Sequence, residues 1–315
     1  MSKYRSNLPF SDGRYFLTDG GMETDFIFHH GIDIPHFATF ELLKKPGMEK
    51  FIQDYFKKYT DIAAEHNAGF ILGGLTWRAN NDWGAKFGYD TPDAVDGVVK
   101  KVIRYLIEIR DKLETENMPI VISGSLGPRG DGYDPGNPIS IEEAKKYHSA
   151  QIRSFFDSET DIVSALTMTN TPETIGIVLA AKEIGMPIAV SFTVETDGNL
   201  PTGMSIKEAI EKVDENSNAY PAYYMINCAH PTHFSHMLKE DGAWKDRLIG
   251  IRANASKCSH EELDNSKELD DGNPVEFGQE YREILAVNPQ IKIIGGCCGT
   301  DHRHVFEAAK ACIQF

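Results

Sequence analysis

Three of the five cysteines lie in two short motifs that are far apart in the chain. Cys228 follows Asn227, while Cys297 and Cys298 are adjacent within a Gly-Gly-Cys-Cys-Gly run. Thiolates are preferred zinc ligands, and a site with three thiolates leaves one tetrahedral position open for a substrate. Adjacent cysteines can bind one metal only where the backbone turns sharply, which the flanking glycines permit. The alternative is that these small side chains simply pack in the core, and the spacing by itself does not decide.

The other potential metal ligands are less well placed. Cys258 lies in an acidic, loop-like stretch and Cys312 in the last amphipathic segment, so we interpret both as structural. The histidines at 29–30, and the pair His302 and His304, lack the spacing that puts two side chains on one helix face. We therefore favour thiolate ligands over histidine.

Polar residues follow several apolar runs of the sequence, where the strands of a parallel barrel would end. Chemistry in such barrels takes place at the carboxyl ends of the strands. The candidate substrate-binding residues at these positions are Asp19, Gly20, Thr76, Trp77, Thr167, Asn227 and Asn254.

Three polar or aromatic residues at the strand ends each have two possible roles. Asp19 suits either substrate orientation or a turn beside its two glycines. Trp77 offers a π-face to a cationic methyl donor or serves as a rim aromatic, and Arg78 suits a substrate carboxylate or a structural ion pair.

These residues belong to a recurring unit, in which a short apolar run is followed by an amphipathic stretch. Near-continuous apolar runs are typical of strands buried on both faces. The predicted strands are Tyr15–Thr18, Phe70–Leu72, Ile120–Ser123, Asp161–Thr167, Pro187–Thr193, Tyr223–Cys228, Leu248–Arg252 and Ile291–Gly296. Helix starts are indicated by Thr91-Pro92, by Thr171-Pro172, and by capping boxes that begin at Ser140 and Ser205.

Eight such units in 315 residues predict an α/β fold, a closed (β/α)₈ barrel with the zinc site at the carboxyl end of its strands. We expect one domain over residues 1–315. An open doubly wound sheet is the alternative, but it would require a Gly-rich dinucleotide loop that Asp19-Gly20-Gly21-Met22 is too short to provide. The Gly- and Pro-rich segment Gly127–Pro138, which follows the third predicted strand, is suited to cover the barrel mouth as a lid.

The bulk composition narrows the possible partners. The formal net charge of −15 argues against nucleic acid or an anionic membrane as the main partner. We find no apolar run long enough to span a membrane and no signal peptide in the segment that begins at Met1, so the expected compartment is the cytoplasm. Cysteines are expected to stay reduced there. The oligomeric state is not fixed, and a homo-oligomer is possible.

The motifs resemble those of the homocysteine S-methyltransferase family. The resemblance rests on Asp19-Gly20-Gly21-Met22, Asn227-Cys228 and the run from Gly295 to Thr300, in matching order along nearly the whole chain. It implies a barrel whose zinc is bound by Cys228, Cys297 and Cys298. It also implies that the thiol of a small acceptor, in this family homocysteine giving methionine, takes the open zinc position and attacks a methyl group on a sulfonium or quaternary ammonium donor.

The chain departs from the family pattern at two strand ends. The family usually carries a glutamate that helps hold the homocysteine amino group, and Leu166 stands in its place. The second strand usually ends Glu-Thr-x-Thr, whereas here Gly73 and Gly74 precede Leu75-Thr76. These departures put the acceptor's identity in doubt. They leave three hypotheses: homocysteine methylation, methylation of another thiol, or a zinc-binding barrel that acts as a sensor or scaffold.

Overall fold

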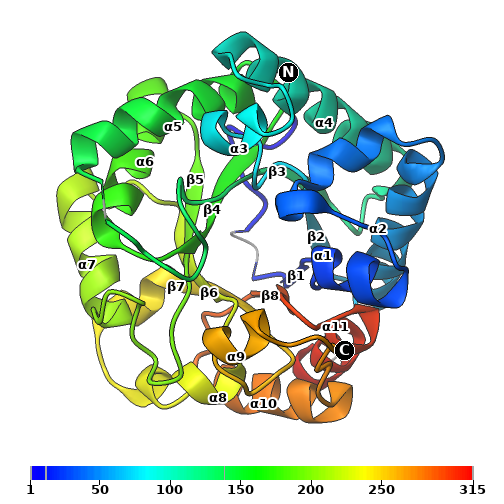
Figure 1. Cartoon of the computed structure of the whole chain (residues 1–315). Helices are drawn as coiled ribbons and strands as arrows, with labels where there is room; N and C mark the ends of the chain where they lie inside the picture. Colours follow the sequence, from blue (N-terminus) through cyan, green and yellow to red (C-terminus); the bar gives the residue numbers. More distant parts are fainter. Residues whose placement is uncertain (1, 11–12, 138, 314–315) are drawn as a thin grey trace.

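The structure is a computed structural model that describes residues 2–10, 13–137 and 139–313. Eight parallel strands close into a barrel in the order β1 to β8, and helices form a ring around it (Figure 1). The strands are β1 Phe16–Leu17, β2 Gly69–Leu72, β3 Ile120–Leu126, β4 Ile162–Met168, β5 Ile188–Phe192, β6 Tyr223–Asn227, β7 Leu248–Ala253 and β8 Ile293–Gly296. The predicted (β/α)₈ barrel is confirmed, and each predicted strand overlaps an observed one.

The helices begin where the sequence offers caps. Thr91, Ser140 and Ser205 accept hydrogen bonds from the backbone at the starts of α4, α5 and α7, as predicted. The cap of α6 is Asn170, one residue before the predicted Thr171. The helices are α1 Met22–Thr24, α2 Met48–Glu65, α3 Asn81–Ala85, α4 Pro92–Leu113, α5 Ile141–Phe156, α6 Thr171–Ile184, α7 Ile206–Ser217, α8 Pro231–Phe234, α9 His260–Asp264, α10 Pro274–Val287 and α11 His302–Cys312.

Alternate residues along the strands divide between two cores. One core lies between the strands and the helices, and the other fills the barrel interior with Phe16, Ile71, Val121, Ile162, Ala189, Tyr223, Met225 and Ile293. The N-terminal segment packs against the interior core through Tyr4, Leu8 and Phe10. The backbone N–H of Tyr4 donates to Asp161 at the start of β4, so this segment covers the amino ends of the strands. The carboxyl ends are therefore the open side for chemistry.

Within the described residues, no helix combines the length and the apolar character that crossing a membrane requires.

Candidate metal centre

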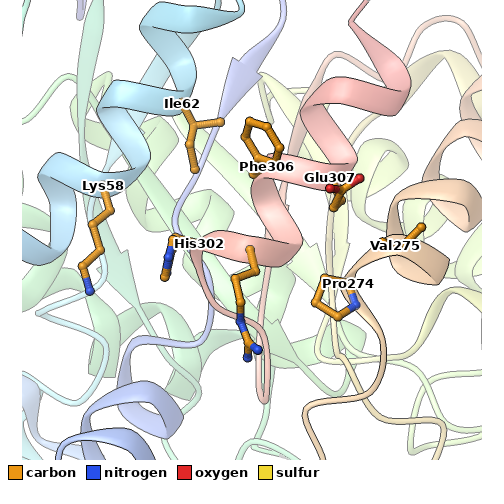
Figure 2. A pocket seen from close by; sticks show the side chains of 8 residues that line it. Lys58, Ile62, Pro274, Val275, His302, Phe306 and Glu307 are labelled. Carbon is orange, nitrogen blue, oxygen red and sulfur yellow. The ribbon is translucent and has the colours of Figure 1, made fainter.

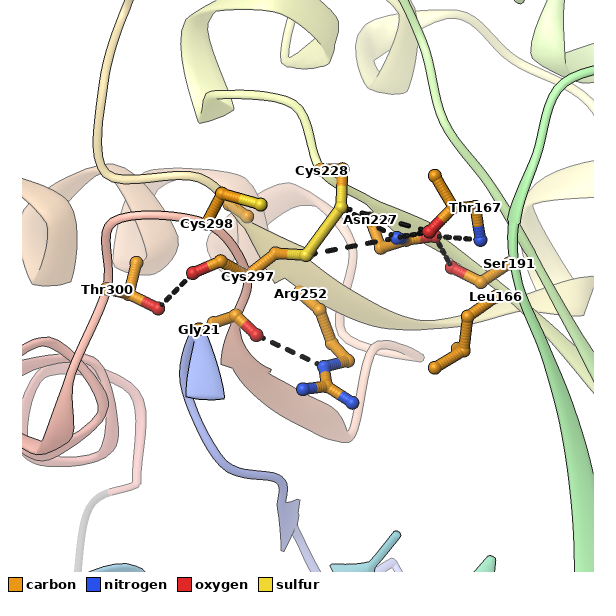
Figure 3. The surroundings of a disulfide bond; sticks show 12 residues. Gly21, Leu166, Thr167, Ser191, Asn227, Cys228, Arg252, Cys297, Cys298 and Thr300 are labelled. Atoms are coloured by element: carbon orange, nitrogen blue, oxygen red, sulfur yellow. Dashed lines mark hydrogen bonds between the residues drawn. A yellow bond between two sulfur atoms is a disulfide. The ribbon is translucent and has the colours of Figure 1, made fainter. Parts of the chain in front are cut away.

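The three motif cysteines meet at the carboxyl end of the barrel. Cys228 directly follows β6, and Cys297 and Cys298 directly follow β8. Their sulfur atoms all lie within 4.8 Å of one another (Figure 3). In the described part of the chain, no other group of cysteine, histidine or acidic residues converges in this way. The cluster has the donor type and the compactness of a zinc site with three thiolates.

The state of two of these cysteines differs from the expectation that all five are reduced. The structure joins Cys228 and Cys297 as a disulfide with a Cα–Cα distance of 5.4 Å, and Cys298 remains a free thiol. The difference follows from the proximity that makes the cluster, because sulfurs gathered around one metal position are also close enough to pair. Metal binding requires thiolates, so the disulfide and a three-thiolate metal centre are alternative states of the same residues.

The charge environment favours thiolate at one position in particular. When the cysteines are reduced, the pKa of the Cys297 thiol is lowered, because Cys228 and Cys298 both donate hydrogen bonds to its sulfur. The positive charge of Arg252 lowers this pKa further. The metal-free cluster therefore stabilises one thiolate, at Cys297, and the hydrogen bonds with this sulfur raise the pKa values of Cys228 and Cys298.

Glycines allow the strand ends to approach closely around the cysteines. Gly299 has a φ of +78°, which turns the chain directly after Cys298. Gly21 is needed for close packing rather than for a turn. A Cβ atom at this position would lie 2.4 Å from the carbonyl oxygen of Cys297. The sharp turn predicted for the run after β8 thus depends on Gly299, whereas Gly295 and Gly296 provide close contacts rather than a positive φ.

Asn227 connects the sulfur cluster to β4 and β5. Its Oδ1 accepts hydrogen bonds from the Thr167 backbone N–H at 3.0 Å and from the Ser191 hydroxyl at 2.6 Å. Its Nδ2 donates to Thr167 Oγ1 at 2.8 Å and to Cys228 Sγ at 3.1 Å. Thr167 and Cys228 have φ values of +61° and +56°, which are uncommon and costly for residues with a Cβ. The Asn227 carboxamide holds both residues in this strained geometry.

Arg252 is a site residue that the sequence analysis did not identify. Its Nη2 donates to Asp19 Oδ1 at 2.7 Å, and its Nε donates to the Gly296 carbonyl at 3.1 Å. Burial lowers the pKa of Arg252, but the negative charges around it, Asp19 foremost and then Cys297, together outweigh this effect and raise the pKa above its usual value. Arg252 is the last residue of a predicted strand, so the alternation of side chains along that strand could indicate that it points inward. Its pairing with Asp19, 233 residues away in the sequence, could not be inferred.

The loop that follows β3 reaches the cysteines, in agreement with its predicted position over the mouth. The hydroxyl of Tyr133 lies 3.3 Å from Cys298 Sγ, and its ring stacks on His260 at 4.0 Å between centroids. His260 in turn donates from Nε2 to the Cys228 carbonyl at 2.6 Å. The sequence analysis named neither Tyr133 nor His260, because only the fold brings them to this end. Pro138, the last residue of the predicted lid, lies outside the described residues.

The remaining predicted pocket residues are partly occupied by structural contacts. The hydroxyl of Thr76 donates to the Ser125 carbonyl at 2.8 Å and accepts from the Ser125 backbone N–H. The indole of Trp77 donates to the Leu166 carbonyl at 3.3 Å, and the Arg78 guanidinium lies 4.0 Å from its ring. The π-face of Trp77 is therefore already covered by a cation of the protein.

Two other predicted pocket residues lie close to the cysteine motifs. Gly20 contacts the end of the β8 loop, since a Cβ atom there would lie 2.8 Å from the Thr300 carbonyl oxygen. Asn254 is buried, its Oδ1 has no partner among the described residues, and with Cys228 it lines a narrow crevice that has no room for a water molecule. An unpaired buried amide oxygen next to the cysteine marks Asn254 as a group with unused binding capacity.

The remaining acidic and histidine candidates lie in different places and make different contacts. Glu23 accepts a hydrogen bond from Thr39, and burial raises the pKa of its carboxyl to about 7. Glu41 instead pairs with Lys44 at 3.0 Å. His302 lies on the outside of the barrel, where it lines a hollow between α2, α10 and α11 (Figure 2). His304 does not contact the cysteines, because its Nε2 donates to the Asp271 carbonyl at 2.8 Å and its Nδ1 accepts from the Asp301 backbone N–H at 3.1 Å.

Comparisons with known proteins agree with the fold. Among solved structures, the chain is similar to the homocysteine methyltransferase MmuM from Escherichia coli. It matches the metallated form at 15% identity with a TM-score of 0.71 over 95% of this chain and 96% of that one, and the oxidized form at 16% identity with a TM-score of 0.73 over 96% and 97%.

Sequence relatives cover nearly the same span. Homocysteine S-methyltransferase 1 of Arabidopsis thaliana is 22% identical over 318 residues, which are 90% of this chain and 89% of the relative. Selenocysteine Se-methyltransferase of Brassica oleracea var. italica is 22% identical over 312 residues, 91% of this chain and 86% of the relative. Residues 16–312 match the sequence profile described as homocysteine S-methyltransferase. The chain therefore belongs to the homocysteine S-methyltransferase family and is an enzyme of the methyltransferase class.

Proposed function

We propose that this protein is a zinc-dependent S-methyltransferase that moves a methyl group from a sulfonium or quaternary ammonium donor to a small thiol. The observation that carries the proposal is the group of three cysteine sulfurs within 4.8 Å at the barrel mouth. Cys228, Cys297 and Cys298 would hold zinc, and their three thiolates leave one tetrahedral position for the acceptor. The names of the relatives, which act on homocysteine and on selenocysteine, support a thiol or selenol acceptor.

The chain's own residues would prepare and enclose the reaction. Bound zinc would supply the acidity that converts an incoming thiol into a thiolate at neutral pH. Asn227 fixes Cys228 and Thr167, while Tyr133 covers the cluster and excludes water. The sulfur of the acceptor forms a bond to the methyl carbon as the bond from that carbon to the donor's sulfur or nitrogen breaks. The electron pair of the broken bond stays on that sulfur or nitrogen atom, which thereby loses its positive charge. This step requires in-line positioning and no general base.

A product screen tests the proposal. Several thiols are crossed with several methyl donors in the presence of zinc and a reductant, and the products are identified by mass spectrometry. We expect at least one S-methylated thiol whose formation stops when a chelator removes the zinc. Stoichiometric zinc without product from any pair would instead support the sensor or scaffold hypothesis.

The two cysteines outside the cluster are predicted to be dispensable for metal binding. Cys258 is exposed in the loop before α9, and burial raises the pKa of Cys312 to about 12, so that its thiol stays protonated. We expect Cys258→Ser and Cys312→Ser to keep one zinc per chain and full methyl transfer. The unfolding midpoint should change only for Cys312→Ser, by the loss of a mostly buried thiol. Loss of zinc in either variant would show that the ligand assignment is wrong.

Tyr133 is predicted to matter for catalysis more than for metal content. Tyr133→Ala removes both the contact with Cys298 and the stack on His260, so water gains access to the cluster. Contacts to metal ligands typically change activity by about ten- to a hundred-fold, and we expect kcat/KM to fall by a factor in this range with zinc retained. Tyr220→Phe is the control, because its hydroxyl bonds to the Met186 carbonyl away from the mouth. A wild-type rate for Tyr133→Ala would contradict a role for this loop.

A further inference from the structure

A guanidinium group lies inside the barrel directly beside the cysteine cluster. Arg252 on β7 is the register partner of Asn227 on β6 and of Gly295 on β8, the two strands that lead into the cysteine motifs. Its Nε donates to the carbonyl of Gly296, the residue before Cys297, and Figure 3 shows Arg252 below Cys297 with its guanidinium pointing away from the sulfur atoms. Its side chain is 14% exposed, so the cation is not completely shielded from solvent.

The carboxylate nearest to this guanidinium is already used. Asp19 Oδ1 accepts from Arg252 Nη2 at 2.7 Å, and Asp19 Oδ2 lies 3.3 Å from the Tyr55 hydroxyl. The Asp19 side chain is only 4% exposed. An ammonium group that entered the site would have to displace Arg252 from a buried ion pair, and removing one partner of such a pair is strongly unfavourable. Asp19 is therefore not available to bind an ammonium group.

The end of β4 adds an apolar wall to the same pocket. Leu166 is half-buried and packs against the interior core of the barrel, so its side chain points inward. It directly precedes Thr167, which contacts both Asn227 and Cys228. A leucine at this position provides neither a charge nor a hydrogen bond to a ligand beside the cysteines. An unpaired ammonium group placed here would lose its hydration without compensation.

We infer that the acceptor is a small thiol that carries a carboxylate and no ammonium group, and that Arg252 binds this carboxylate. The inference rests on the proposed function, because it concerns the acceptor of that site. Arg252 Nη1 is suited to the task, since it donates no hydrogen bond to any described residue while Nε and Nη2 are engaged. Guanidinium groups pair well with carboxylates and stay charged at all relevant pH values.

Glu23 is the alternative partner for an ammonium group, and it would restore an amino-acid acceptor. Its charge interacts with both Asp19 and Cys297, and only Thr39 is seen to donate to its carboxyl. Burial raises its pKa to about 7, and an ammonium group bound beside it would lower this pKa again. Arg252 is favoured on geometry, because its Nη1 donates to no described residue, whereas Glu23 already accepts from Thr39 at 2.8 Å. The Glu23→Gln variant below tests this choice directly.

Binding measurements on the reduced, zinc-loaded protein distinguish these possibilities without relying on turnover. Isothermal titration is done with 4-mercaptobutanoate, which carries only a carboxylate, with 3-mercaptopropylamine, which carries only an ammonium group, and with homocysteine, which carries both. We expect 4-mercaptobutanoate to bind at least as tightly as homocysteine and about ten-fold or more tighter than 3-mercaptopropylamine, the factor that a charged hydrogen bond provides. Any other order overturns the inference. If none of the three thiols binds, the proposed function itself is contradicted.

Two variants test the residues named. Arg252→Met should remove most of the preference for 4-mercaptobutanoate over 3-mercaptopropylamine, and Arg252→Lys should keep part of it. Because Arg252→Met leaves Asp19 unpaired and can misfold, Leu166→Glu provides an independent measurement. It should raise the affinity for homocysteine about ten-fold relative to that for 4-mercaptobutanoate. Glu23→Gln should leave the order of the three thiols unchanged, and a loss of homocysteine binding in this variant would assign the ammonium to Glu23 and overturn the inference.

Discussion

Replacing Cys297 and Cys298 together with alanine is expected to abolish zinc binding and methyl transfer. The two sulfurs supply two of the three donors in the cluster, and Cys228 alone cannot enclose a metal ion. A free thiol has a pKa of about 8.5, so only a few per cent is thiolate at neutral pH. Without the metal, the acceptor loses both its activation and its position, and the rate should fall on the order of a thousand-fold or more.

The measurement requires reducing conditions, because Cys228 and Cys297 can pair as a disulfide. Zinc is quantified by metal analysis after gel filtration, and folding is checked by circular dichroism. The matched control is the Cys258→Ser, Cys312→Ser double variant, which also loses two thiols but should keep one zinc per chain. Undiminished zinc in the Cys297→Ala, Cys298→Ala variant would place the metal elsewhere and remove the basis of the proposed function.

The fold could be predicted from the sequence because the strands are buried on both faces. Runs such as Ile120–Ser123 and Leu248–Ile251 are apolar or small throughout, and both fall inside observed strands. Position at a strand end then predicts that Cys228 and Cys297 meet, since the carboxyl ends of barrel strands share one mouth. This reasoning needs only local patterns and one geometric rule, and the sulfur cluster confirms it.

The parts of the site that the sequence did not reveal depend on contacts between distant segments. Arg252 looks like an ordinary strand residue until β7 and β1 bring it against Asp19. Tyr133 lies in an irregular loop, where no periodicity indicates which side chain turns toward the cysteines. The sequence leaves two roles open for Trp77, a π-face for a cationic donor or a rim aromatic, and in the folded chain the neighbouring Arg78 lies 4.0 Å from its ring. Such pairings are decided by tertiary packing, which spacing along the chain does not encode.

The network around Asn227 gives the second prediction with a large effect. Asn227→Ala would leave the Thr167 backbone N–H and the Ser191 hydroxyl without the oxygen that accepts from both. Both residues are buried, and each unsatisfied group costs about 1–3 kcal/mol. With the small cavity that the truncation adds, we expect the free energy of unfolding to fall by roughly 3–5 kcal/mol, and the strained conformations of Thr167 and Cys228 to relax.

Asn227→Asp separates the effect on the metal from the effect on stability. The aspartate keeps an oxygen for Thr167 and Ser191, but it replaces the Nδ2 that donates to Cys228 Sγ at 3.1 Å with a second oxygen. A carboxylate beside a thiolate is repulsive, so we expect zinc affinity to fall by about ten- to a hundred-fold in chelator competition. The loss of stability should be smaller than in Asn227→Ala.

Asn288→Asp is the matched control, because this asparagine is also buried but bonds to the Ile284 carbonyl at the end of α10, outside the barrel. That variant should lower stability and leave zinc affinity unchanged. Equal zinc affinity in Asn227→Asp and wild type would mean that Asn227 shapes the backbone of the site without supporting the thiolates.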